Sequence, residues 1–296
     1  MTEHPTRVIF LGGLGRSGTT LLERLLAELP GVTALGEVVH LWSRGVLSAE
    51  PCGCGVPFPS CPFWRCVGER AFGGWSRPLA ERVLALRHRV DRTRRIPRIA
   101  HPGLAEYADA YRRVYDAVGT PVVIDSSKHA SLAYCLVAAG VDVRVAHVVR
   151  DPRAVAHSWG RSVPRPEDGR PMTRWGSART ALHWSAQNLA LDRLARRGAS
   201  VVRVRYEDLV ADPAATLTAL AGELGLPASG LPFLDGALVR LSPAHTVSGN
   251  PMRFAVGPVE LRRDDSWQAA LPARQRRLVG ALTWPLRSRY GYLEAA

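Results

Sequence analysis

A glycine-rich segment near the N-terminus is the strongest candidate for an anion-binding site. It reads GGLGRSGTT over residues 12–20, between an apolar run at residues 7–11 and a helical pattern at residues 19–29. Glycines permit a tight turn that brings backbone N–H groups close to an anion, and the following helix adds the positive end of its dipole. We therefore expect the loop to bind a phosphate or a similar oxyanion.

The loop differs from that of nucleoside triphosphatases at one position. Those enzymes have the pattern GxxxxGK[ST], and here Gly13 and Gly18 keep the spacing while Thr19 stands where the lysine belongs. The cation of the loop is instead Arg16, inside the turn. Because a triphosphatase needs that lysine on the terminal phosphates, a kinase or triphosphatase is the weaker alternative.

A second candidate anion site follows the apolar run at residues 143–149. Arg150 ends the expected strand, Asp151 is a suitable helix N-cap and Pro152 a suitable first helical residue. Ser158 lies about two turns into that helix. A guanidinium at a strand end can hold a phosphate with two parallel hydrogen bonds. The alternative is that Arg150 pairs with an acid and Ser158 faces the core.

With these motifs the chain resembles the sulfotransferases that use 3′-phosphoadenosine-5′-phosphosulfate (PAPS), in their bacterial and Golgi-type branches. In that family a loop like RSGTT holds the 5′-phosphosulfate, and an Arg with a Ser eight residues later holds the 3′-phosphate. The resemblance implies PAPS as the co-substrate, adenosine 3′,5′-bisphosphate as a product, and a hydroxylated small molecule or glycan as the acceptor. It implies donor contacts from Gly15, Arg16, Ser17, Gly18, Thr19, Thr20, Arg150 and Ser158.

The resemblance also implies the reacting groups. Glu37 ends the segment ALGE in the Gly-Glu context of the family's catalytic base, and a carboxylate there could accept a hydroxyl proton. Lys128 follows a strand, as does the family's lysine that contacts the sulfate, and would stabilise charge together with Arg16. The alternatives to these catalytic roles are that Glu37 lies on the surface or caps a helix, and that Lys128 is exposed at the start of a helix. Asp125 could instead be a magnesium ligand of the triphosphatase type.

Two further segments match the family less specifically. A C-terminal loop closes over PAPS in the family, and in the turn-rich residues 245–253 it points to Ser248, Asn250 and Arg253, with Arg262 as a further candidate. An ordinary surface loop is the alternative. The segment YEDL at residues 206–209 is interpreted as a structural cap after a strand.

Apolar runs alternate with helical patterns along the chain, which indicates a parallel sheet covered on both faces. We expect a P-loop-like three-layer α/β fold in a single domain over residues 1–296, with about five strands and ligands at their carboxyl ends. Residues 41–120 are expected to form a helical insertion at the acceptor side, and residues 226–270 a lid-like loop. The expected strands are 7–11, 121–125, 143–149 and 201–204, and the expected helices 130–139, 152–161, 173–197 and 213–224.

Composition sets broader limits. The chain has 296 residues, with 39 Lys and Arg against 26 Asp and Glu, a net charge of +13, which favours an anionic partner. The arginines of residues 84–101 are interpreted as a solvated helix face rather than a nucleic-acid or acceptor site. No apolar run reaches the length of a membrane span, and no signal peptide is visible. A non-catalytic anion- or nucleic-acid-binding protein is the other alternative.

Four of the five cysteines are clustered, at Cys52, Cys54, Cys61 and Cys66. The spacing C-x-C, followed by gaps of six and four, matches paired zinc ligands poorly. We therefore expect free thiols and no metal, with zinc or a disulfide as alternatives. An odd number of cysteines favours reduced thiols and a cytoplasmic location. The sequence leaves open the acceptor, a donor of the aryl sulfate type, and whether the chain forms a homodimer.

Overall fold

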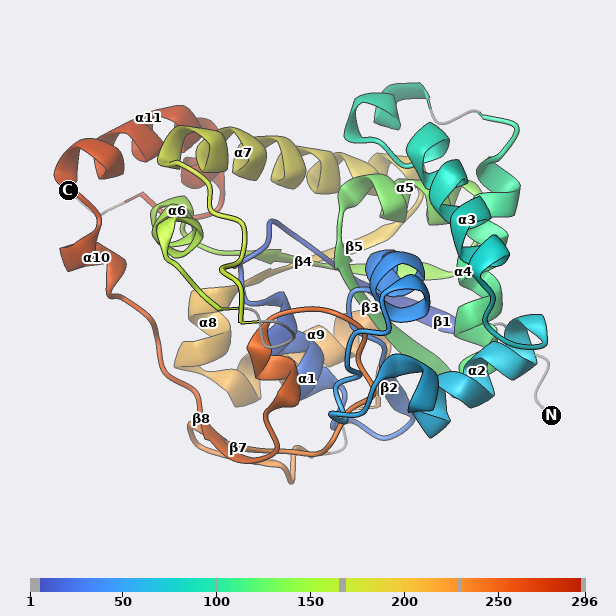
Figure 1. Cartoon of the computed structure of the whole chain (residues 1–296). Coiled ribbons are helices and arrows are strands. Elements are labelled where there is room, and N and C mark those ends of the chain that lie inside the picture. Colours follow the sequence, from blue (N-terminus) through green and yellow to red (C-terminus); the bar gives the residue numbers. More distant parts are fainter. Residues whose placement is uncertain (1–5, 99–100, 165–168, 228–229, 294–296) are drawn as a thin grey trace.

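A five-stranded parallel sheet forms the centre of the fold (Figure 1). The computed structural model describes residues 6–98, 101–164, 169–227 and 230–293. The strand order β2-β3-β1-β4-β5 puts the most apolar strand in the middle. The strands are β1 (Arg7–Gly12), β2 (Val32–Ala34), β3 (Val122–Lys128), β4 (Val143–Val149) and β5 (Ser200–Arg205).

Helices cover both faces of this sheet, which explains why its central strand reads as a continuous apolar run. Ile9 and Leu11 of β1 pack toward one set of helices, while Val8 and Phe10 pack toward the other. Burial on both faces is typical of parallel strands. The first face carries α1 (Thr19–Leu26), α8 (Tyr206–Ala211) and α9 (Pro213–Leu224), and the second α5 (Ala130–Ala138) and α7 (Ser177–Leu194). The expected three-layer α/β fold is therefore confirmed.

The strand-to-helix junction after β4 folds as its sequence predicts. The Asp151 side chain accepts a hydrogen bond from the backbone N–H of Arg153, and Pro152 is the first residue of α6 (Pro152–Gly160). An N-cap of this kind stabilises a helix by about 1 kcal/mol. The helix expected from residue 173 begins later, at Ser177, because Gly176 has an extended backbone.

The insertion at residues 41–120 is mostly helical, as expected. Its own core is aromatic, with Trp42, Trp64 and Tyr111 fully buried. The arginine-rich α3 presents a largely solvated face, except that Arg87 turns inward and donates to the carbonyl oxygen of Val39 at 3.1 Å. The elements, with η1 just before the insertion, are η1 (Val38–His40), η2 (Leu41–Leu47, a π-helix), η3 (Phe58–Ser60), α2 (Pro62–Phe72), α3 (Arg77–Val90), η4 (Thr93–Arg98) and α4 (Leu104–Val118).

Residues 226–270, expected to be loop, contain a small antiparallel sheet in the order β6-β7-β8. Alternating burial along β7 puts Val239 and Leu241 into the core beneath α1 and α9, and this short pattern was missed among the Pro, Gly and Ser residues. Residues 228–229 lie outside the described residues. The elements are β6 (Leu234–Asp235), β7 (Leu238–Leu241), η6 (Pro251–Phe254), β8 (Gly257–Glu260) and α10 (Trp267–Ala270).

Two features complete the described chain. Helix α11 (Ala273–Arg289) packs against α6 and α7 at the C-terminal end (Figure 1). Among the described residues, no helix is both long and apolar enough to cross a membrane.

Candidate active site

A cavity of about 550 Å³ opens at the carboxyl ends of the strands. Loop 12–20, the ends of β3 and β4, the start of η1 and the segment 249–252 all border it. Ser17, Ser248 and Arg253, which were also predicted to bind the donor, are not among its lining residues. The predicted residues that line it are Gly15, Arg16, Gly18, Thr19, Thr20, Glu37, Lys128, Arg150 and Ser158.

The glycine loop adopts a conformation that requires glycine at Gly13 and Gly18. A Cβ on Gly13 would lie 2.5 Å from the carbonyl oxygen of Val148, and one on Gly18 would lie 2.5 Å from the ring of Tyr206. Both glycines also have positive φ, at 152° and 95°. The loop therefore closes tightly above β4 and starts α1 with its N–H groups at the cavity.

One polar atom of the loop fits a bound anion. The hydroxyl of Ser17 is buried and has no hydrogen-bond partner among the described residues. A buried hydroxyl left unpaired costs about 1–3 kcal/mol, so a phosphate oxygen at this helix start would satisfy it. The donor chemistry of the loop, with N–H groups, a hydroxyl and the helix dipole, matches a phosphate.

Arg16 lies beside two stacked tryptophans, Trp159 and Trp175, which the sequence analysis did not predict at the site. Its guanidinium lies 5.8 Å from the ring centroid of Trp159 and donates to the sulfur of Met172 at 3.1 Å. The indole N–H of Trp159 donates to the carbonyl oxygen of Gly15 at 2.8 Å, and its ring stacks on Trp175 at 4.0 Å. Stacked indoles beside the glycine loop offer an apolar surface for a flat ring.

Arg150 lies at the end of β4, next to the loop. It donates to the carbonyl oxygen of Arg16 at 3.3 Å, and its guanidinium lies 4.3 Å above the ring of Tyr206. It also approaches the Asp264 carboxylate at 3.4 Å, so the acid pairing weighed as an alternative is present, while Arg150 still lines the cavity. Tyr206, interpreted from sequence as part of a structural cap, lines the cavity as well.

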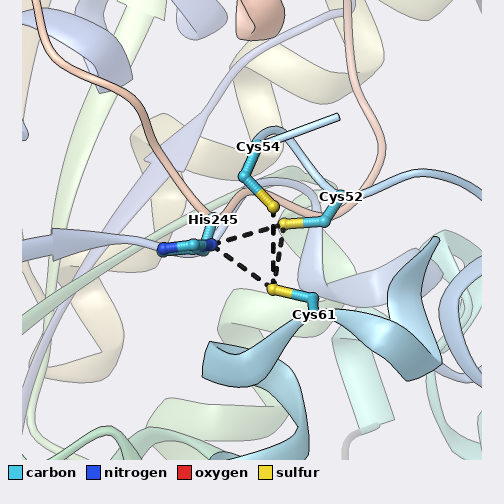
Figure 2. A group of neighbouring side chains, drawn as sticks. All are labelled: Cys52, Cys54, Cys61 and His245. Carbon is cyan, nitrogen blue, oxygen red and sulfur yellow. Dashed lines mark hydrogen bonds between the residues drawn. The ribbon is translucent and has the colours of Figure 1, made fainter. Parts of the chain in front are cut away.

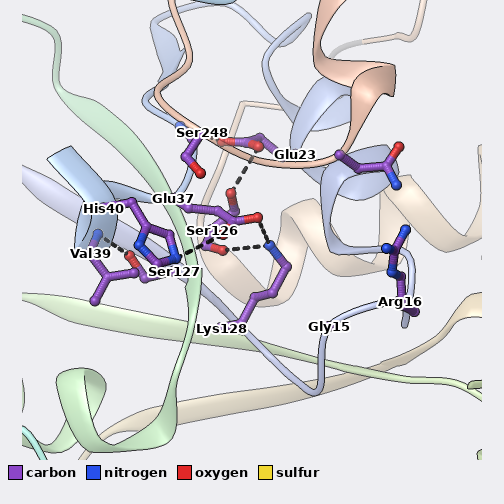
Figure 3. Close-up of polar contacts among 12 residues, drawn as sticks. Gly15, Arg16, Glu23, Glu37, Val39, His40, Ser126, Ser127, Lys128 and Ser248 are labelled. Atoms are coloured by element: carbon purple, nitrogen blue, oxygen red, sulfur yellow. Dashed lines mark hydrogen bonds and ion pairs between the residues drawn. The ribbon is translucent and has the colours of Figure 1, made fainter. Parts of the chain in front are cut away.

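Glu37 and Lys128 form an ion pair at the cavity, across from Arg16 (Figure 3). Only 16% of the Glu37 side chain and 13% of the Lys128 side chain are exposed. Burial opposes ionisation of Glu37, but the charge and hydrogen bond of Lys128 together with His40 and Arg44 outweigh it and lower the pKa of Glu37 to about 2. His40 lies 3.5 Å from the same carboxylate, and burial lowers the pKa of its imidazole to about 3, so it is neutral.

Two buried carboxyl groups support this pair from below. Glu23 of α1 accepts hydrogen bonds from the backbone N–H of Gly36 at 2.7 Å and from the hydroxyl of Ser126 at 2.9 Å. Burial raises the pKa of Glu23 to about 7. Its contacts hold the end of β2, where Glu37 follows, against β3. Sequence reasoning missed Glu23 because a glutamate in a helix ordinarily faces solvent.

Asp125 is the other buried carboxyl group. It accepts hydrogen bonds from the hydroxyl of Tyr115 at 2.6 Å and from the backbone N–H of Ser127 at 2.8 Å, and burial raises its pKa to about 6. It does not line the cavity. These contacts make Asp125 a structural group rather than the magnesium ligand weighed from sequence.

The segment 245–253 lies against the site, although most of its predicted contacts are made with protein. Ser248 accepts a hydrogen bond from Arg44 at 2.9 Å. Arg253 is buried and donates to the carbonyl oxygens of Thr246 at 2.9 Å and Pro51 at 2.8 Å. Asn250 lines the cavity. The fourth candidate is elsewhere: Arg262 is exposed and pairs with Glu260.

Comparison with known proteins agrees with this geometry. Residues 105–230 match the model of a sulfotransferase family. That segment contains Lys128, Arg150 and Ser158 but not the glycine loop or Glu37. No curated protein matches the sequence.

Several solved structures are similar to the chain. The sulfotransferase domain of the Synechococcus PCC 7002 olefin synthase superposes with a TM-score of 0.53 at 21% identity, covering 96% of each chain. STF1 from Mycobacterium tuberculosis H37Rv gives 0.43 at 20% identity, over 76% of this chain and 69% of its own. The first likeness establishes the P-loop-like fold. Residues 105–230 are thus similar to a sulfotransferase family, and the chain shares the fold of a sulfotransferase domain.

Proposed function

We propose that the protein transfers the sulfuryl group of PAPS to a hydroxyl group of a small-molecule or glycan acceptor, with Glu37 as the general base. The observation that carries the proposal is the Glu37–Lys128 ion pair at the same cavity as Arg16, the glycine loop and Arg150. Sulfuryl transfer needs these groups together: a base for the attacking hydroxyl and cations around the developing charge.

The donor would lie along the loop. Backbone N–H groups at the start of α1 and the Ser17 hydroxyl suit the 5′-phosphate, with Arg16 at the sulfuryl end. Arg150 and Ser158 would bind the 3′-phosphate, and the 3.3 Å contact between Arg150 and the backbone of Arg16 keeps the two anion sites adjacent. A nucleotide with phosphates at both positions matches this pair of sites better than a triphosphate.

The chemistry follows from the ion pair. The acceptor oxygen attacks sulfur, the bond from sulfur to the bridging oxygen breaks, the hydroxyl proton passes to Glu37, and adenosine 3′,5′-bisphosphate leaves. Lys128 and Arg16 stabilise the negative charge that grows on the leaving oxygen. A carboxylate whose pKa is about 2 is a weak base. An anionic donor would draw Lys128 away from Glu37, and the buried carboxylate would then become more basic.

Calorimetry with two nucleotides tests the donor site. We expect adenosine 3′,5′-bisphosphate to bind more tightly than magnesium–ATP, because the chain has a site for a 3′-phosphate and lacks the triphosphatase lysine. Preference for ATP would refute the proposal and favour a kinase. Incubation with ³⁵S-labelled PAPS and a lysate of the source organism should label a hydroxylated product, which identifies the acceptor.

A further inference from the structure

Three cysteines and a histidine converge on one point beside the active site (Figure 2). The ligand atoms of Cys52, Cys54, Cys61 and His245 all lie within 4.8 Å of one another. Cys52 and Cys61 are fully buried, whereas Cys54 and His245 are partly exposed. The fifth cysteine of the chain, Cys135, and the neighbouring Cys66 are not members of the group.

Four of the six distances among these atoms are close to those of a tetrahedral metal site. The Sγ atoms of Cys61 and Cys52 are 3.6 Å apart, and those of Cys54 and Cys61 are 3.8 Å apart. His245 Nδ1 lies 3.3 Å from the sulfur of Cys61 and 3.7 Å from that of Cys52. Tetrahedral zinc with bonds of about 2.3 Å to sulfur and 2.0 Å to nitrogen puts neighbouring ligands about 3.8 Å and 3.6 Å apart. A disulfide would need about 2.05 Å between sulfurs.

The backbone around the group is built for close approach. The carbonyl oxygen of Cys52 accepts a hydrogen bond from the N–H of Gly55 at 2.8 Å, which makes the turn at residues 52–55 compact. The N–H of Gly53 donates to the carbonyl oxygen of Thr246 at 2.9 Å, so the turn lies directly on the segment that contains the histidine. The ring of Phe63 stacks on His245 at 5.0 Å and fixes its orientation.

We propose that Cys52, Cys54, Cys61 and His245 bind one Zn²⁺ ion as a closed structural site. Three thiolates and one imidazole in a tetrahedron are the ligand set that zinc prefers over magnesium or calcium. All four positions are filled by protein, which leaves no open position for catalysis. The site goes beyond the proposed function, because no step of sulfuryl transfer uses it.

The ion would join two parts of the chain that are far apart in sequence. The cysteines belong to the start of the insertion, and His245 begins the segment that borders the active site. Two residues after His245, the carbonyl oxygen of Val247 accepts a hydrogen bond from the N–H of Glu37 at 2.8 Å. Zinc would thereby hold the insertion against the segment that positions the candidate base.

Metal analysis of the full chain, purified without a polyhistidine tag, tests the site. We expect about one zinc per chain. Cobalt substituted for zinc should give the intense visible bands of tetrahedral cobalt with thiolate ligands. Zinc below about a tenth of an equivalent would overturn the proposal, as would iron or copper in its place.

Single substitutions locate the ion. Cys54→Ser and His245→Ala change the partly exposed ligands, so they should fold, lose most of the bound zinc and melt at a lower temperature. Cys66→Ser is the matched control and should keep the full zinc content. Unchanged zinc in both ligand variants would overturn the assignment. This readout is independent of activity, so failure of the sulfotransferase proposal leaves it intact.

Discussion

Backbone strain is concentrated around the candidate site. Among the described residues, four that are not glycine have positive φ, and three of them are Arg16 (74°), Lys128 (68°) and Ser248 (56°). A side chain in this region costs about 1–2 kcal/mol, and such strain persists where the surrounding structure fixes it. The two cations of the proposed mechanism therefore reach the cavity from backbone positions that the sheet and the loop impose.

Glu37→Gln tests the base. We expect sulfuryl transfer to fall by about 10²–10⁴-fold, the usual contribution of general base catalysis. Binding of adenosine 3′,5′-bisphosphate should change little, since the amide cannot take a proton but fills the same space. Rates with labelled PAPS and calorimetry separate the two effects. Glu69→Gln, on the exposed face of α2, is the matched control, and full activity of Glu37→Gln would remove Glu37 as the base.

Arg150→Ala tests the 3′-phosphate site. Loss of a charge-assisted hydrogen bond costs about 1.5–3 kcal/mol, so we expect the bisphosphate Kd to rise by about 10–150-fold. Adenosine 5′-phosphate, which lacks the 3′-phosphate, should lose much less affinity in the same variant. Arg262→Ala removes an exposed arginine and serves as the control. Equal affinity of wild type and Arg150→Ala for the bisphosphate would refute the anchoring role.

At the residue scale, the sequence predicted those site residues that follow a strand. Arg16, Glu37, Lys128 and Arg150 each stand in a local motif, and strand ends in a parallel sheet meet at one edge. All four line the cavity. His245 had no such signal, because nearly two hundred residues separate it from the cysteines it meets. The cysteine spacing matches zinc ligands poorly because the fourth member of the group, His245, lies far from the cysteines in sequence.

At the element scale, periodicity predicted the sheet and its helices, while short elements escaped. Strand β4 and helix α9 have their predicted bounds, because each is a long pattern with clear ends. Strands β6, β7 and β8 have at most four residues each, too few for a period to stand out from the surrounding turn residues. Their pairing depends on tertiary contacts with α1 and α9.

Glu23 of helix α1 accepts hydrogen bonds from Gly36, just after β2, and from Ser126 of β3. We expect this buried carboxyl group to make the stability of the protein depend on pH. The pKa of Glu23 in the folded protein, about 7, lies above the usual glutamate pKa of 4.5. The folded state therefore holds a proton that the unfolded chain releases, and stability is lost as pH rises from 4.5 through 7. Glu23→Gln cannot release a proton. Between pH 4.5 and 8, its free energy of unfolding should gain about 2–3 kcal/mol relative to wild type.

Urea unfolding of both proteins at the two pH values measures this difference. Glu69→Gln, which removes an exposed carboxylate, should show almost no gain. A difference between Glu23→Gln and wild type that stays constant with pH would mean that Glu23 is already ionised in the folded protein.

At the scale of the whole molecule, three segments that are distant in sequence meet beside the candidate active site. Residue Val247 pairs with Gly36, the turn at residues 52–55 lies on Thr246, and Arg253 links Thr246 to Pro51. The start of the insertion, the segment after β2 that contains Glu37 and the segment 244–253 thus form one packed unit. The excess positive charge of the chain is not concentrated at this junction or at the cavity. Few of the arginines line the cavity, and most of the α3 arginines face solvent.

Gly53→Ala tests this junction. Its Cβ would lie 2.5 Å from the carbonyl oxygen of Ala244 and 2.5 Å from the hydroxyl oxygen of Thr246, one of them backbone that cannot rotate away. The turn at residues 52–55 must then separate from residues 244–246, and we expect the free energy of unfolding to fall by about 1–3 kcal/mol. Transfer activity should fall too, because Val247 positions Glu37. Gly222→Ala in α9 meets open space and should be neutral or stabilising by up to about 1 kcal/mol. Equal urea midpoints for the two variants would show that the turn and residues 244–246 are not tightly packed.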